Sequence, residues 1–95
     1  MQINIEAIIN TVKNHLDESA VFQVLDESEQ HRGHKGHNPK VGVTHIALNI
    51  AWDAFEGLTL LERQRLANTW LDGFFKQGLH AVRYSLKTPD ENIAL

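Results

Sequence analysis

The sequence contains no cysteine, which excludes disulfide bonds, thiol nucleophiles and thiolate metal sites built by this chain alone. Its longest apolar run is a few residues, far short of the roughly 20 that a membrane-spanning helix needs. The N-terminus lacks a basic segment followed by an apolar one, so we predict no secretion signal and a cytoplasmic protein. The formal net charge is −3, whereas non-specific DNA-binding proteins usually carry a basic excess.

Histidine, in contrast, is abundant: the 95 residues include six histidines, and four of these lie between His31 and His45. The chain is long enough for one domain, residues 1–95, with a modest core. No nucleophile has a base at a recognisable spacing, and there is no phosphate-binding glycine loop or HExxH metalloprotease motif, so we predict that the protein is not an enzyme. A metal or cluster bound here must use imidazole, carboxylate or the thiols of a partner.

The first half of the chain predicts one helix and two strands. Apolar residues recur at helical spacing from Ile3 to Leu16, with Asn4 as the N-cap. A strand is expected over Ala20–Leu25, and strict alternation predicts another over Thr44–Trp52. Between these strands, residues 28–42 show no periodicity and are expected to form a variable loop. A loop of this length is usually functional or mobile.

The second half predicts a short helical turn, a long helix, a strand and a frayed tail. Thr59 and Glu62 form a capping box that starts the long helix, and Gly78 ends it. The short helical turn is expected at residues 53–57, the long helix at 60–78, the strand at 79–88 and the tail at 90–95. The order α-β-β-α-α-β indicates an α+β, two-layer sandwich in which helices cover one face of a three-stranded mixed sheet. The first two strands are expected to pair antiparallel, and the helical crossover permits a parallel third strand.

Several local motifs occur together in a specific order. They are Asp26-Glu27-Ser28, His31, Gly33-His34, Thr44-His45, Phe55 with Gly57, Arg63 with Arg65-Leu66, Leu79-His80-Ala81 and Thr88-Pro89. In this combination, over nearly the whole chain, the sequence resembles the BolA family, whose fold is related to the class II K-homology (KH) domain. The chain departs from the family where Gln64 replaces the middle histidine of Arg-His-Arg and where Ile46 replaces a phenylalanine.

The resemblance implies a partnership with a monothiol glutaredoxin in iron-sulfur and iron homeostasis. In the family, such a heterodimer shares a [2Fe-2S] cluster, and glutaredoxin and glutathione supply thiolates. The BolA partner supplies a histidine near its last strand and a His or Cys from the loop between the first two strands. On this sequence the two cluster ligands correspond to His80 and His31.

The histidines also have simpler interpretations. By position alone, His80 is more readily a half-buried histidine on the side of Val82 and Leu86; the Leu79-His80-Ala81 match favours the ligand. In the loop, His34 is equally well a cluster ligand or a polar loop residue, and His37 fits a polar loop better.

The two remaining histidines are interpreted as structural or solvated. His45 is expected to oppose the Ile46 face as a structural histidine, and His15 to be solvated. The loop histidines could alternatively bind Zn²⁺ or Ni²⁺ directly, because imidazole suits both metals.

The main alternative function is a DNA-binding transcriptional regulator of stress response and cell morphology, which a KH-like fold permits. Arg63 and Arg65, near the start of the long helix, would contact phosphate. Against this, the GxxG at Gly33–Gly36 lies between strands rather than between helices, so we treat it as accidental. A homodimer is compatible with the sequence.

Overall fold

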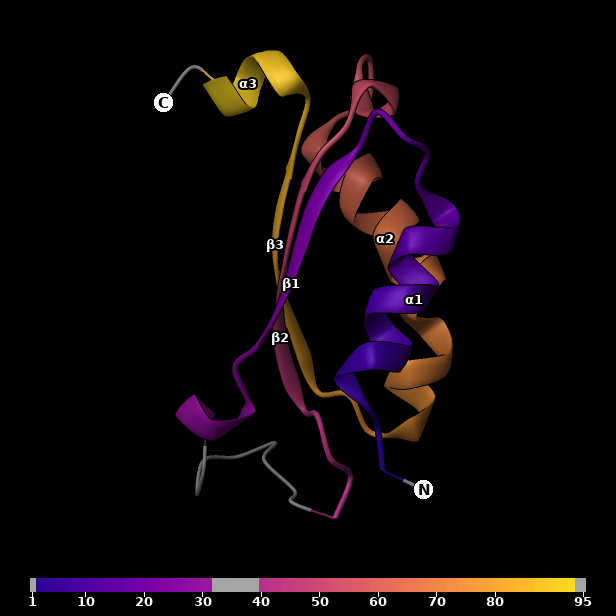
Figure 1. Cartoon of the computed structure of the whole chain (residues 1–95), viewed down its shortest axis with the longest axis vertical. Coiled ribbons are helices and arrows are strands. Elements are labelled where there is room, and N and C mark those ends of the chain that lie inside the picture. The colour runs from indigo at the N-terminus through magenta and orange to yellow at the C-terminus, as the bar shows by residue number, and fades with distance from the viewer. Residues whose placement is uncertain (1, 32–39, 94–95) are drawn as a thin grey trace.

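The computed structural model describes residues 2–31 and 40–93, although the side chains of His31 and Ile93 lie outside that description. The predicted order of helices and strands is confirmed, with two additions, η1 and α3 (Figure 1). The elements are α1 (Ile5–His15), β1 (Val21–Asp26), the 3₁₀ helix η1 (Ser28–His31), β2 (His45–Ala51), the 3₁₀ helix η2 (Asp53–Phe55), α2 (Leu60–Gln77), β3 (Ala81–Lys87) and α3 (Pro89–Ile93). No helix in the described part of the chain is long and apolar enough to cross a membrane.

The three strands form one mixed sheet in the order β1-β2-β3. β1 pairs antiparallel with β2, with Val21 opposite Ala51, and β2 pairs parallel with β3, with His45 opposite Ala81. Helices α1 and α2 both cover the same face of the sheet (Figure 1). The fold is therefore the predicted α+β two-layer sandwich, and the parallel pairing brings the N-terminal ends of β2 and β3 together.

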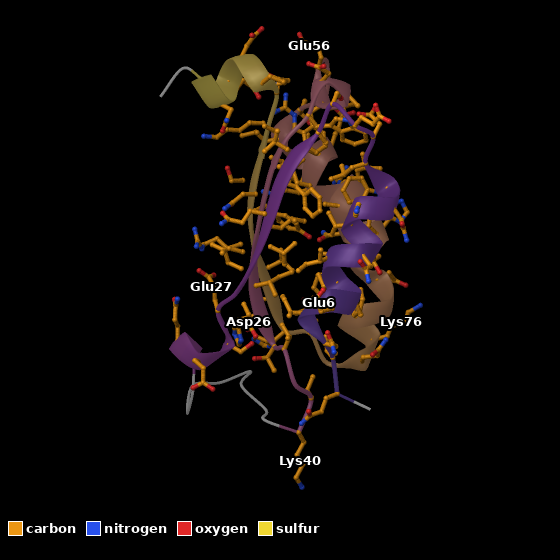
Figure 2. The ribbon with its side chains drawn as sticks, in the orientation of Figure 1. Glu6, Asp26, Glu27, Lys40, Glu56 and Lys76 are labelled. Atoms are coloured by element: carbon orange, nitrogen blue, oxygen red, sulfur yellow. The ribbon has the colours of Figure 1, made fainter. Side chains whose placement is uncertain are left out.

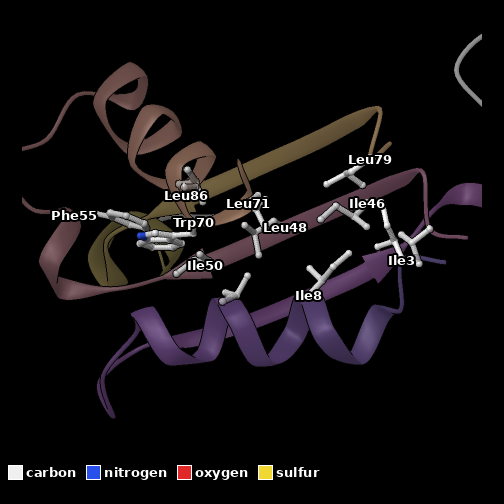
Figure 3. Packing of buried hydrophobic residues seen from close by; sticks show 13 residues of the cluster. Ile3, Ile8, Ile46, Leu48, Ile50, Phe55, Trp70, Leu71, Leu79 and Leu86 are labelled. Carbon is white, nitrogen blue, oxygen red and sulfur yellow. The ribbon is translucent and has the colours of Figure 1, made fainter. Parts of the chain in front are cut away.

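The core lies between the sheet and the two long helices. Ile46, Leu48 and Ile50 alternate along β2 and are buried, because every second side chain of a strand points to the same face. Figure 3 shows these three side chains directed toward Ile8 of α1 and Leu71 of α2. Burial of this apolar face fixes the register of β2, so the alternate residues, beginning with His45, face away from the helices.

The predicted helix signals are present in the structure. The Asn4 side chain accepts a hydrogen bond from the backbone N–H of Glu6. Thr59 and Glu62 form the expected capping box at the start of α2, with bonds of 3.1 and 2.9 Å. Gly78 ends α2 at a φ of 120°, and a Cβ at this position would lie 2.8 Å from a Val41 methyl carbon, so glycine is required for both reasons.

The predicted frayed tail at residues 90–95 is wrong for residues 90–93, which belong to α3. Thr88 and Glu91 form a second capping box: the backbone N–H of Thr88 donates to the Glu91 carboxylate at 2.8 Å, and the backbone N–H of Glu91 donates to the Thr88 hydroxyl at 3.3 Å. Pro89 takes the first helical position, where its missing N–H costs nothing. The helix-start signal Thr88-Pro89-Asp90-Glu91 is present in the sequence, and the prediction of a frayed tail did not take it into account.

Candidate functional site

The candidate site lies at the end of the sheet where β2 and β3 begin. η1 and the turn from α2 into β3 lie at this same end (Figure 1). Figure 2 places Asp26 and Glu27 there too, at the end of β1 beside η1. Two segments 52 residues apart in the sequence, at residues 28 and 80, are thus neighbours in the fold.

Hydrogen bonds to Thr44 hold these segments together. The backbone N–H groups of Thr44 and His45 donate to the Ser28 hydroxyl at 2.9 and 3.3 Å. The carbonyl of Thr44 accepts from the backbone N–H groups of His80 at 2.8 Å and Ala81 at 3.2 Å. Thr44 is completely buried, so it is a fixed point to which both the start of the loop and the start of β3 are attached.

His45 is buried, with 5% of its surface exposed. Its Nδ1 lies 2.9 Å from the Thr44 hydroxyl, and its backbone carbonyl accepts from the N–H of Glu27 at 2.8 Å. The prediction of a structural histidine that opposes the Ile46 face agrees with this geometry.

His80 is exposed and lies one residue before β3, rather than within the strand as predicted. Its ring contacts the ring of His45, with 5.3 Å between centroids and 47° between the ring planes. The predicted place of His80, in the row with Val82 and Leu86, is therefore wrong: the strand and its alternation begin only at Ala81. An exposed imidazole on a fixed backbone is well suited to meet a metal that a partner brings.

The loop candidates are placed only in part. The backbone of His31 ends η1, which the Ser28 hydroxyl attaches to Thr44 and His45. The side chain of His31, and the whole of His34 and His37, lie outside the described residues. Among residues 2–31 and 40–93, no three His, Asp or Glu side chains form a group that could hold a metal ion.

A hollow of about 370 Å³ opens between η1 and the starts of β2 and β3. Its lining comprises Glu27, Gln30, His45, Ile46, Ala81 and Arg83. Arg83 donates to the Glu27 carboxylate at 2.6 Å, and this contact raises the pKa of the arginine. The charges of Arg83 and Glu27 at the hollow therefore compensate each other.

Arg63, predicted as a phosphate contact for the DNA-binding alternative, is in the interior with 5% of its surface exposed. Its guanidinium donates to the carbonyls of Leu58 at 3.1 Å and Leu86 at 3.0 Å, and to the Glu91 carboxylate at 2.6 Å. The hydrogen bond from Arg63, followed by the one from the Thr88 backbone N–H, lowers the pKa of Glu91 to about 2. That role for Arg63 is therefore corrected: its charge is used inside the protein to attach α3 to α2 and β3. Arg65, in contrast, is exposed.

The contact between His45 and His80 was missed at the sequence level. Both residues were noted, but as members of separate strands. Once β2 and β3 are taken as parallel neighbours, the starts of the two strands must lie side by side. The contact could therefore have been predicted from the parallel topology, because Thr44-His45 and Leu79-His80 both lie at the starts of these strands.

Comparison with known proteins gives consistent relatives. A model of the BolA-like protein family matches residues 12–91. SufE-like protein 1 of Arabidopsis thaliana, described as chloroplastic/mitochondrial, is 43% identical over 73 residues, which is 74% of this chain but only 20% of that protein. The chain thus spans about a fifth of the length of this relative.

Two solved structures are similar over nearly their whole length. The BolA domain of SufE1 from Arabidopsis thaliana has a TM-score of 0.76 at 38% identity, and the match covers 90% of this chain and 92% of that one. BolA1 from the same plant has a TM-score of 0.79 at 30% identity, with coverage of 96% and 97%.

Proposed function

The chain belongs to the BolA-like family, and we propose that it is a non-catalytic adaptor that binds a [2Fe-2S] cluster together with a monothiol glutaredoxin. In this proposal His80 is one ligand and His31 the other, with His34 as the alternative loop ligand. Glutaredoxin and its glutathione supply the thiolates, which this chain lacks.

The observation that carries the proposal is the place of His80. Its ring is exposed, its backbone is held by the Thr44 carbonyl, and the loop with the other histidines begins at the same end of the sheet. The donor set also fits: with neutral imidazole on this side and thiolates on the other, the cluster has mixed ligation, which raises its reduction potential above that of an all-thiolate cluster.

In this proposal the chain must meet two requirements. Each ligand histidine must present an unprotonated nitrogen, because an imidazolium cannot bind a metal. The exposed end of the sheet must also accept the partner closely enough for both proteins to reach one cluster. Neither of these requirements calls for a nucleophile or a general base, in keeping with a non-catalytic adaptor.

The test is anaerobic reconstitution of the cluster with a monothiol glutaredoxin and glutathione, followed by visible absorption and circular dichroism. Wild-type protein should replace the spectrum of the glutaredoxin homodimer with a different heterodimer spectrum. His80→Ala should abolish the change, and either His31→Ala or His34→Ala should alter it.

The matched control is His15→Ala. His15 is exposed at the C-terminal end of α1, where it stacks on Trp70 with a centroid distance of 5.2 Å. It lies near the opposite end of the sheet from His80, so the heterodimer spectrum should remain. A wild-type spectrum in His80→Ala, or equal losses in His15→Ala and His80→Ala, would contradict the assignment.

The DNA-binding alternative has no comparable support, because one of its two arginines is buried in an ion pair. We retain the cytoplasm as the proposed compartment. The plant relative described as chloroplastic/mitochondrial shows that family members are not confined to it.

A further inference from the structure

The buried pair Thr44-His45 requires an explanation of its own. Polar side chains are costly to bury unless hydrogen bonds satisfy them. Thr44 is completely buried and His45 nearly so. Their shared contact of 2.9 Å, between the Thr44 hydroxyl and His45 Nδ1, satisfies polar atoms that an apolar pair would not contain.

The contact between Thr44 and His45 also affects His80, which lies next to the His45 ring. The hydroxyl of Thr44 restrains the rotation of the His45 ring, because a hydrogen bond to Nδ1 has a preferred direction. The His45 ring lies 5.3 Å from the His80 ring, so the orientation of the first limits the rotamers open to the second. The carbonyl of the same Thr44 fixes the backbone of His80 at 2.8 Å.

We propose that Thr44 and His45 are positioning residues for His80: the Thr44 hydroxyl fixes the His45 ring, and that ring holds the exposed imidazole of His80 in one orientation. This rests on the proposed function, in which His80 is a cluster ligand. Residues behind a metal ligand that set its orientation typically change metal affinity by about 10- to 100-fold when they are replaced.

The same pair also connects the loop to His80. The Ser28 hydroxyl accepts from the backbone N–H groups of both Thr44 and His45, and η1 carries the chain from Ser28 to His31. Thr44 and His45 therefore hydrogen-bond both to the segment that leads to His31 and to the backbone of His80.

The experiment compares Thr44→Val, which keeps the shape but removes the hydroxyl, with Thr44→Ser, which keeps the hydroxyl. In the free protein, NMR of labelled histidine reports the ring carbon and proton shifts of His80. Thr44→Val should shift the His80 ring signals and broaden its rotamer distribution, and Thr44→Ser should restore the wild-type signals. In the heterodimer, the cluster should be lost about 10- to 100-fold faster from Thr44→Val than from wild type, whereas Thr44→Ser should stay near wild type.

Val12→Ala is the control for simple loss of stability. Val12 is completely buried in α1, on the far side of the core from the exposed sheet face. It should lower the unfolding midpoint while leaving both the His80 signals and the cluster lifetime unchanged. If Thr44→Val does not fold, His45→Phe serves in its place, because it keeps a ring and removes the hydrogen-bonding nitrogen.

The outcomes separate the two proposals. Unchanged His80 signals and an unchanged cluster lifetime in Thr44→Val would overturn the positioning role, as would equal effects of Thr44→Val and Val12→Ala. If wild-type protein forms no cluster with glutaredoxin, the proposed function fails, and the His80 signals of the free protein still decide whether Thr44 orients that ring.

Discussion

Replacement of Arg63 by methionine tests whether this arginine belongs to the core or to a nucleic-acid surface. Methionine keeps most of the apolar stem and removes the guanidinium. The change leaves the carbonyls of Leu58 and Leu86 without their Arg63 donor, and it separates Glu91 from its cation. We expect a folded protein of clearly reduced stability.

The magnitude follows from the contacts that are lost. The bond to the Leu86 carbonyl is buried, and an unsatisfied buried carbonyl costs about 1–3 kcal/mol. The Leu58 carbonyl is partly buried and adds less. The guanidinium also lies 5.6 Å from the centre of the Phe55 ring, a contact worth about 0.5–1 kcal/mol. Glu91 is 49% exposed and returns to water, so the total loss is about 2–4 kcal/mol, within the roughly 5–15 kcal/mol of a typical domain.

The assay is equilibrium unfolding in urea, followed by tryptophan fluorescence. With a slope of about 2 kcal/mol per molar urea, the middle of the range for a small protein, the midpoint should fall by roughly 1–2 M. Arg65→Met is the matched control: Arg65 is two residues away on the same helix and exposed, so the free energy of unfolding of this variant should stay within about 0.5 kcal/mol of wild type.

A stability equal to wild type in Arg63→Met would refute this reasoning. It would mean that the hydrogen bonds to Leu58, Leu86 and Glu91 contribute nothing net. If DNA affinity fell in this variant while stability was kept, the nucleic-acid role of Arg63 would be restored.

Three further predictions follow from the structure. The pKa of Glu91 is held at about 2, below its ordinary value of 4.5. Its contribution to stability is therefore present above pH 4.5 and is lost as the pH falls toward 2, and urea unfolding across this range should show that Glu91→Gln removes that acid dependence. Gly42→Ala should destabilise more than Gly57→Ala: both have positive φ, 90° and 83°, but only at Gly42 would a Cβ lie 2.5 Å from a backbone oxygen, and thermal unfolding would reveal the difference. In a salt titration, any DNA affinity should be weak, and Arg63→Met should leave its salt slope unchanged, since each phosphate contact would contribute about −0.9 to that slope.

The fold was predictable because local signals and the hydrophobic pattern agreed. The alternation through Ile46, Leu48 and Ile50 fixed β2 and its buried face. Capping residues located the start of α2 to the residue. η1 escaped prediction because a single 3₁₀ turn has no hydrophobic period; it is held by a bond from the Ser28 backbone to the Asp26 side chain at 3.0 Å and by bonds to the Ser28 hydroxyl.

The candidate site was predictable only in part. His80 was found through its family motif, but its exposure and its contact with His45 depend on where β3 begins, and strand ends are the least certain feature of a sequence pattern. Arg63 was misplaced for a related reason. Its position on α2 is in line with Ala67 and Trp70, which are buried. A buried arginine is nevertheless not expected without a partner, and that partner, Glu91, comes from the distant end of the chain.

The distribution of charge favours an adaptor over a binder of phosphates. In the part of the chain that the structure describes, three basic side chains already have acidic partners: Arg63 with Glu91, Lys76 with Asp72, and Arg83 with Glu27. At these three side chains a phosphate would have to displace a carboxylate, and the protein as a whole carries a net charge of −3. An imidazole meets no such competition when it binds a metal, because it does so as a neutral ligand. The exposed ring of His80, supported from behind by a buried threonine and histidine, therefore suits a metal-centred partnership better than an electrostatic one.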